Sequence, residues 1–147
     1  MIDDCVICGL LSGELEVSLV HRDELCAGFM DIQPINPGHM LIVPVRHSSA
    51  LAELRSEESS QMFRVAQALS EALRKSSVKC EGVNLFLADG EAAGQEIFHT
   101  HLHVVPRYIG DGFGFNFPSG YHNKPARSEL TLLAGKIRAL LQFDTHS

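Results

Sequence analysis

The sequence predicts an α+β fold with a sheet of about five, mainly antiparallel strands, one central helix and one C-terminal helix. Short apolar segments separated by turn residues fill the first part of the chain and return after residue 83, which indicates strands. Apolar residues at helical spacing lie between these groups of strands and recur near the C-terminus. At 147 residues, the chain has the size of a single domain that can close one core.

The strands are predicted from apolar and β-branched segments that end at turn residues. They are expected at Ser18–His21, Cys26–Asp31, Met40–Val43, Asn84–Ala88 and Phe98–Val105. The third strand is apolar throughout, so we expect it to be buried on both faces. Pro106 has no backbone N–H and is expected to end the fifth strand.

Each predicted helix carries one apolar face. The central helix is expected to begin with Ser56 as its N-cap, and its apolar positions are Met62, Val65, Ala66, Leu69 and Leu73. A glycine-rich loop at 110–114 precedes the C-terminal helix, whose apolar positions are Leu130, Leu133, Ile137, Leu140 and Leu141.

Composition and charge argue against several classes of function. A net charge of −6 disfavours nonspecific binding to nucleic acid or to an anionic membrane, because both need a basic surface. No stretch approaches the roughly 20 apolar residues of a membrane span, and the first residues do not resemble a secretion signal. The cytoplasm is therefore the expected location, and the four cysteines are expected to be thiols or metal ligands rather than disulfides.

Three histidines alternate along the fifth predicted strand, in His99-Thr100-His101-Leu102-His103. In an extended chain these histidines share one face, while the residues between them face a core. A polar or metal-binding surface stripe is one interpretation, and a catalytic zinc site is another. The outer two side chains would lie ~13 Å apart, too far for both to reach one ion at about 2.1 Å. A third interpretation has His101 attack the substrate while its neighbours orient it, because neutral imidazole is nucleophilic near neutral pH.

This segment resembles the His-x-His-x-His signature of the histidine triad (HIT) superfamily, with apolar residues among the intervening positions. The surrounding motifs resemble the family as well: Gly94-Gln95 before the triad, Pro106-Arg107 after it, and Asn36-Pro37-Gly38-His39 with Met40–Pro44 upstream. The similarity covers about residues 4–114, which leaves a C-terminal loop and helix over 115–147. It implies a single HIT domain similar to the Hint and Fhit nucleotide hydrolases.

The resemblance also implies roles for individual residues. Family members attack an α-phosphate, form a nucleotidyl-histidine and release a nucleoside monophosphate. The attacking residue would be His101, with His103 at the phosphate and His39 supporting the triad. Gln95 would donate to the phosphate or the leaving group. These residues, with Asp31 as the ribose acceptor and Phe29, Ile32, Ile7 and Leu10 around the base, would form the nucleotide-binding site.

Two positions depart from the family pattern. Many members have Ser or Thr after the glutamine, where this chain has Glu96, and many have Asn where this chain has Ala88. A carboxylate at Glu96 could act as a general acid if its pKa were raised, and would otherwise repel phosphate. Strand alternation leaves open whether Glu96 faces the histidines or points away. Asp31 could equally be a turn cap, and each apolar residue of the base pocket could be ordinary core.

Cys5-Val6-Ile7-Cys8 has the spacing of half a zinc site. A redox pair is the weaker interpretation, because no strand is predicted before it, and two free thiols are the simplest alternative. The zinc-binding bacterial-type branch of the family, which this chain resembles, completes such a site with two histidines. Here they would be His47 and His99, giving a structural Zn²⁺ with four protein ligands.

The sequence thus predicts a hydrolase or transferase that acts on a nucleoside phosphate, with a purine nucleotide as the expected ligand. A phosphoramidate or a dinucleoside polyphosphate would be the substrate, and the resemblance implies a homodimer. Two alternatives remain: a zinc-stabilised nucleotide-binding module with little turnover, and a zinc-dependent hydrolase.

Overall fold

The computed structural model describes residues 4–143, which form two compact units. The first ends at Asp111 and contains the sheet, and the second begins at Gly112. The elements of the first unit are α1 (Val6–Ser12), β1 (Leu19–Arg22), β2 (Cys26–Met30), β3 (Met40–Pro44), α2 (Ser56–Lys75), β4 (Gly82–Leu87) and β5 (Leu102–Arg107), with short 3-10 turns at Leu51–Glu53 and Glu91–Ala93. The second unit contains α3 (Arg127–Leu140).

The five strands form one sheet in the order β1-β2-β3-β5-β4, and every neighbouring pair is antiparallel. This arrangement confirms the predicted α+β fold and the number of strands. The β3 strand is buried along its whole length, as its unbroken apolar sequence predicted. Among the described residues, no helix is long and apolar enough to cross a membrane.

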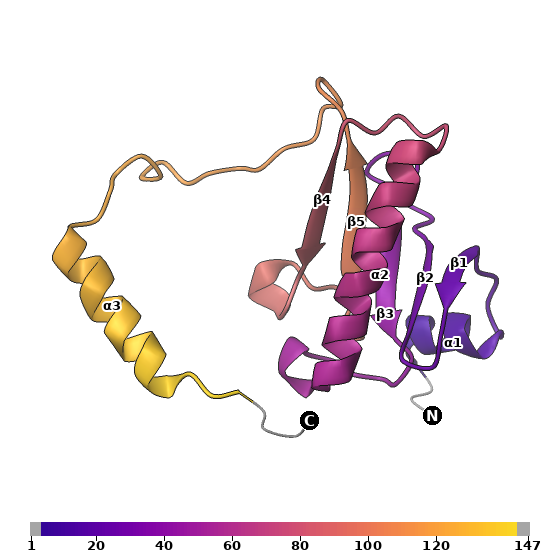
Figure 1. Ribbon diagram of the computed structural model, residues 1–147, viewed down its shortest axis with the longest axis horizontal. Helices are drawn as coiled ribbons and strands as arrows, with labels where there is room; N and C mark the ends of the chain where they lie inside the picture. The colour runs from indigo at the N-terminus through magenta and orange to yellow at the C-terminus, as the bar shows by residue number, and fades with distance from the viewer. Residues whose placement is uncertain (1–3, 144–147) are drawn as a thin grey trace. The chain divides into compact units, whose positions relative to one another are not determined.

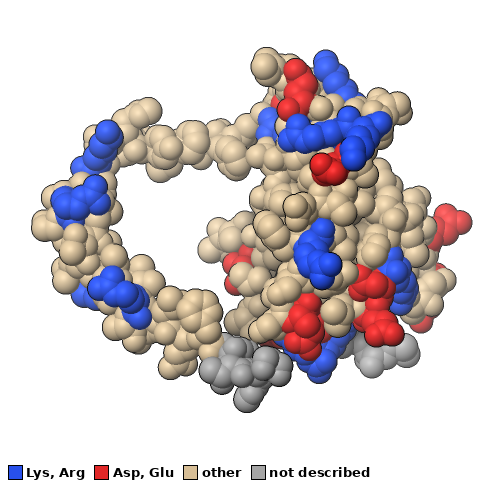
Figure 2. Space-filling view, in the orientation of Figure 1, with Lys and Arg blue, Asp and Glu red and all other residues tan. Residues whose placement is uncertain are grey.

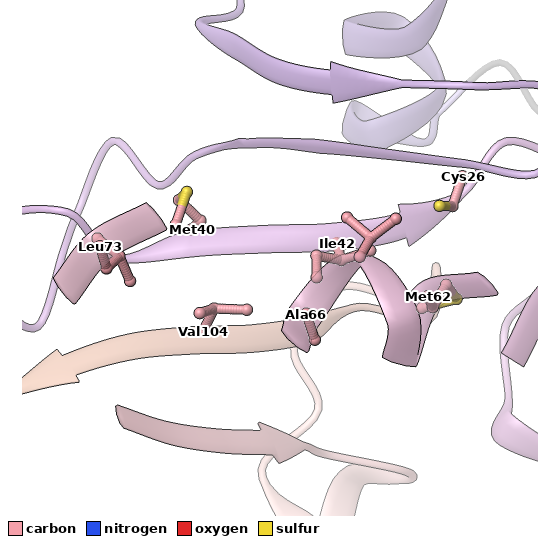
Figure 3. Close-up of a cluster of buried hydrophobic side chains, with 8 residues drawn as sticks. Cys26, Met40, Ile42, Met62, Ala66, Leu73 and Val104 are labelled. Carbon is pink, nitrogen blue, oxygen red and sulfur yellow. The ribbon is translucent and has the colours of Figure 1, made fainter. Parts of the chain in front are cut away.

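The α2 helix packs on one face of the sheet (Figure 1), and its apolar side chains face the strands. Basic and acidic side chains are interspersed on the face of the first unit seen in Figure 2. Within α2, Lys75 and Glu71 form an exposed ion pair. On its inner side α2 contributes Met62, Ala66 and Leu73 to a buried cluster. Figure 3 shows this cluster, in which Met40, Ile42 and Val104 of the sheet meet the helix.

The opposite face of the sheet is covered by α1, a helix that the sequence analysis did not predict. Its buried residue Ile7 packs with Phe29 of β2 and Leu41 of β3. Side chains alternate along a strand, so Leu41 points to this face, away from α2. Cys5 caps this helix, since its Sγ accepts from the backbone N–H of Cys8 at 3.4 Å. With only seven residues, α1 is too short to show a clear helical period, so its stability depends on this packing.

Several predicted boundaries are wrong, those of α2 and the fifth strand most clearly. Ser56 does not cap α2 but is its first residue, and the Glu58 carboxylate accepts from the backbone N–H of Arg55 at 2.8 Å instead. The fifth strand begins at Leu102 rather than Phe98 and passes through Pro106. Pro106 fits because β3 pairs with β5 only as far as Val104, so no ladder bond to β3 is lost at the proline.

Candidate active site

The imidazole of His101 is held by the backbone beside it. Its Nδ1 lies 2.7 Å from the carbonyl oxygen of His99, an atom that can only accept a hydrogen bond. Nδ1 therefore carries the proton, and Nε2 of the neutral ring keeps an unshared electron pair. The side chain is 8% exposed, and it lines a cavity of about 1010 Å³ together with His103. This arrangement presents a nucleophilic nitrogen to a space in which a substrate can bind.

A chain of hydrogen bonds fixes the tautomer of His103. The backbone N–H of Ile35 donates to Nδ1 of His39 at 3.0 Å, which leaves the proton of a neutral His39 on Nε2. That Nε2–H donates to Nδ1 of His103 at 2.9 Å. Neutral His103 must then carry its own proton on Nε2, where it can donate to a bound group.

The ring of His103 also stacks on Phe86 of β4, with centroids 4.3 Å apart and planes 18° from parallel. The two residues are directly paired across β4 and β5, so the strand register brings them together. Leu41 pairs with His103 from the other side, on β3. The sequence analysis missed Phe86 as a site residue, because a strand's alternation does not reveal its register against a distant strand.

Burial favours the neutral form of His103 and of His39. Burial, together with the neighbouring His101 and His39, lowers the pKa of His103 to about 4, while Asp31 acts in the opposite direction. Burial also lowers the pKa of His39, against the opposing effect of Asp31, whose Oδ2 lies 3.6 Å from Nε2 of His39. Neutral rings preserve the hydrogen-bond chain described above, since a protonated His103 could not accept at Nδ1.

The cavity beside the histidines contains most of the residues predicted to bind a nucleotide. Its lining includes Ile7, Leu10, Phe29, Asp31 and Ile32. Ile7 and Phe29 are buried core residues as well, whereas Ile32 is fully exposed at the rim. Asp31 is a turn cap, because its Oδ1 accepts from the backbone N–H of Gln33 at 2.8 Å, yet it keeps accepting capacity toward the cavity.

The side-chain amide of Gln95 is hydrogen-bonded to the backbone of its own loop region and of Ser49. Its Oε1 accepts from the N–H of Gly90 at 2.8 Å, and its Nε2 donates to the carbonyl oxygens of Ser49 and Ile97 at 2.9 and 3.1 Å. Both amide hydrogens are therefore engaged, and Gln95 does not line the cavity. In this structure the buried Gln95 holds the loop before the histidines in place instead of offering a donor to a phosphate.

A candidate metal site is formed by Cys5, Cys8, His47 and His99, the last of which lies two residues before His101 in the chain. One ligand atom from each residue lies within 4.8 Å of the others. Nδ1 of His99 is 3.5 Å from Sγ of Cys5 and 3.6 Å from Sγ of Cys8, and Nδ1 of His47 is 3.4 Å from the latter sulfur. A tetrahedral zinc ion, about 2.3 Å from sulfur and about 2.1 Å from nitrogen, would separate such atoms by about 3.6 Å. The four residues therefore fit a tetrahedral metal site.

The surroundings of His99 prepare it to be a ligand. Its Nε2 lies 2.8 Å from the carbonyl oxygen of Pro44, so the proton is on Nε2 and Nδ1 faces the sulfurs. Burial lowers the pKa of His99, which favours the neutral, ligating form. Burial and the neighbouring Cys5 raise the pKa of the Cys8 thiol, an effect that a bound cation would reverse.

The loop at Ser48 explains why the predicted alternation of three histidines on one strand is only partly right. Thr100 donates to the carbonyl oxygen of Ser48 through both its backbone N–H, at 2.7 Å, and its hydroxyl, at 2.9 Å. These bonds hold residues 99–101 against the loop before β5 begins. His99 consequently lies in the metal cluster, while His101 and His103 face the cavity.

The site combines two histidines beside a cavity with a neighbouring Cys/His cluster, in a fold built on an antiparallel sheet. Comparison with known proteins identifies the family that has this combination. Residues 12–110 match the model of the HIT domain. A HIT-like protein of Borreliella burgdorferi is 40% identical over 113 residues, which cover 76% of this chain and 81% of that protein. An adenylylsulfatase of Arabidopsis thaliana is 35% identical over 105 residues, which cover 71% of this chain and 53% of that protein.

Solved structures agree with this comparison. A HIT family protein from Bacillus anthracis matches with a TM-score of 0.87 and 32% identity, covering 97% of this chain and 100% of that one. A zinc-bound histidine triad protein from Mycobacterium smegmatis matches with a TM-score of 0.73 and 33% identity, covering 95% and 99% of the two chains. The chain belongs to the HIT family, as its histidine motif predicted.

Proposed function

We propose that this protein is a nucleoside phosphate hydrolase or transferase in which His101 becomes transiently nucleotidylated. The observation that carries the proposal is the orientation of its imidazole: Nδ1–H is bound to the His99 carbonyl, so the electron pair of Nε2 is free beside a cavity. An imidazole held in this way needs no further base to become a nucleophile at neutral pH. The adenylylsulfatase among the relatives supports hydrolysis at a nucleotide phosphate.

In the proposed first step, Nε2 of His101 forms a bond to the α-phosphorus, and the bond from phosphorus to the leaving group breaks. The leaving group departs with the electron pair and takes up a proton. In the second step a water molecule attacks the same phosphorus, the bond to His101 breaks, and a nucleoside monophosphate is released. The Nε2–H of His103, held by His39, would donate to a phosphate oxygen on which negative charge develops.

The nucleoside would occupy the cavity between α1 and the end of β2. Ile7, Leu10, Phe29 and Ile32 would contact the base, and Asp31 would accept from the ribose hydroxyls. A volume of about 1010 Å³ is at the upper end of the range for small-molecule sites, so it has room for a leaving group as well. Gln95 would support this site through the loop that it holds.

We also propose that Cys5, Cys8, His47 and His99 bind Zn²⁺ with a structural role. Four protein ligands complete a tetrahedral site and leave no position for a substrate or water. The zinc would hold the N-terminus of α1 against the segment before β5. It would also steady the His99 carbonyl, which in turn orients His101. The homodimer and the cytoplasmic location remain predictions.

Trapping the covalent intermediate tests the catalytic proposal. The protein is mixed with an adenosine phosphoramidate, quenched in base, and its peptides are analysed by mass spectrometry. We expect the mass of AMP on the peptide that contains His101, and a loss of activity of at least about a thousandfold in His101→Ala. His122→Ala, which changes an exposed histidine of the second unit, is the control. Tight binding of AMP without an adduct or turnover would instead favour a nucleotide-binding module.

A further inference from the structure

Glu96 lies where the two candidate sites meet. It lines the cavity that contains His101 and His103, and it also lines a second cavity of about 510 Å³ that contains Cys5 and His47. The sequence left open whether this side chain faces the histidines or points away. The structure places it on the wall shared by the two cavities, exposed to solvent and so able to meet a bound molecule.

Asp31 and Glu96 line the same cavity as the histidine pair but come from different segments of the chain. Asp31 follows β2 and lies near His39, which is bonded to His103. Glu96 belongs to the loop that leads through His99 to His101. If the nucleoside lies at Asp31 and the α-phosphate at His101, the group beyond that phosphate has the remaining cavity wall, which includes Glu96, as its neighbour. Glu96 is then placed to contact the leaving group.

The charge of the two cavities has a single sign. Their lining includes four carboxylates, Asp4, Glu16, Asp31 and Glu96, and no lysine or arginine among the described residues. This composition differs from the mixed charges around α2 in Figure 2. A leaving group with several phosphates would bring additional negative charge next to these carboxylates, with no lysine or arginine in the described lining to compensate it. An amine with a second, protonated amino group would be attracted instead.

We propose that Glu96 is a specificity-determining residue that selects substrates whose leaving group carries a positive charge over those with a polyphosphate leaving group. The inference rests on the proposed function and chooses between its two substrate classes, in favour of phosphoramidates of diamines. In the reaction, Nε2 of His101 bonds to phosphorus and the P–N bond breaks. The amine nitrogen keeps the electron pair and takes up a proton from water, while its distant ammonium group stays beside Glu96.

The test compares two phosphoramidates of adenosine that have nearly the same size. One is made from putrescine and ends in an ammonium group, and the other is made from pentylamine and ends in a methyl group. Diadenosine tetraphosphate is the third substrate. Because the carboxylate is exposed, we expect kcat/KM to favour the putrescine compound by about two- to fivefold, and added salt to reduce this preference. Diadenosine tetraphosphate should be the poorest of the three.

Variants separate the charge of Glu96 from its size. Glu96→Gln should make the two phosphoramidates equivalent, and Glu96→Lys should reverse the preference and improve turnover of diadenosine tetraphosphate. Glu91→Gln is the control, because Glu91 is an exposed carboxylate of the same loop but lines neither cavity. This variant should keep the wild-type preference. Circular dichroism verifies that each variant is folded.

The outcomes distinguish the two levels of the proposal. If the wild-type protein turns over none of the substrates and forms no adduct, the proposed function itself fails. If it turns over both phosphoramidates at equal rates, or if Glu96→Gln keeps the full preference, the function stands and the role of Glu96 is refuted. A preference for diadenosine tetraphosphate in the wild-type protein would likewise refute it.

Discussion

Gly38, the residue before His39, has little room for a methyl group, so replacing it by alanine should destabilise the fold. Its φ of +98° lies in a region that residues with a Cβ rarely adopt. A Cβ at this position would lie 2.9 Å from Cγ1 of Val78, 3.1 Å from Cδ2 of Leu73 and 3.3 Å from Cγ of Pro106. Gly38→Ala therefore combines backbone strain of about 1–2 kcal/mol with overpacking of about 1–3 kcal/mol.

Gly13 provides a matched control. It caps α1 with a φ of +86°, but a Cβ there would have no atom within 4 Å. Gly13→Ala should therefore lose only the backbone contribution, about 1–2 kcal/mol. Urea denaturation of both variants gives their free energies of unfolding, and we expect Gly38→Ala to be less stable than Gly13→Ala by about 1–3 kcal/mol. Equal destabilisation would refute the packing argument.

Three further predictions concern His103, the metal cluster and Gln95. His103 has a pKa of about 4 when folded and 6.5 otherwise, so the unfolded chain binds an extra proton between these values. Stability should therefore fall as pH drops from 6.5 toward 4, by up to about 2 kcal/mol after allowance for its partial exposure, and denaturation of His103→Gln should show a flatter pH profile. Cys8→Ser should lose bound zinc, measured by metal analysis of the purified protein, whereas Cys80→Ser, outside the cluster, should retain it. Gln95→Ala removes a buried amide and its hydrogen bonds to partly buried backbone groups, and should lower the free energy of unfolding in urea by about 1–3 kcal/mol; a loss as small as that of an exposed side chain, under about 0.5 kcal/mol, would contradict its role in the loop.

Much of the fold was predictable because the pattern of apolar residues within a single strand or helix shows its type and its buried face. The unbroken apolar sequence of Met40–Val43 indicated a strand buried on both faces, and the structure confirms it. The helical spacing of Met62, Ala66 and Leu73 indicated the face of α2 that meets the sheet. Both patterns depend on periodicities within one element, which a sequence displays directly.

The boundaries and the short helix were harder to predict for physical reasons. The seven residues of α1 give fewer than two helical turns, too few for a period to stand out. The start of β5 depends on Thr100, whose two hydrogen bonds to Ser48 come from a loop 52 residues away. The preference of Pro for strand ends was overridden because the ladder with β3 had already ended at Val104.

By itself, the sequence determined the family, the antiparallel fold and the residue types that can attack a phosphate or bind zinc, because these are written in motifs and local periods. The family resemblance already implied that His99 joins the metal cluster while His101 and His103 serve the substrate, but only the tertiary structure shows the contacts that separate them. The loop at Ser48 directs His99 to Cys5 and Cys8, while strand register stacks His103 on Phe86. The same contacts engaged Gln95 and brought Glu96 to the cavity wall. Such pairings join segments far apart in the chain, and no local pattern specifies which of them meet.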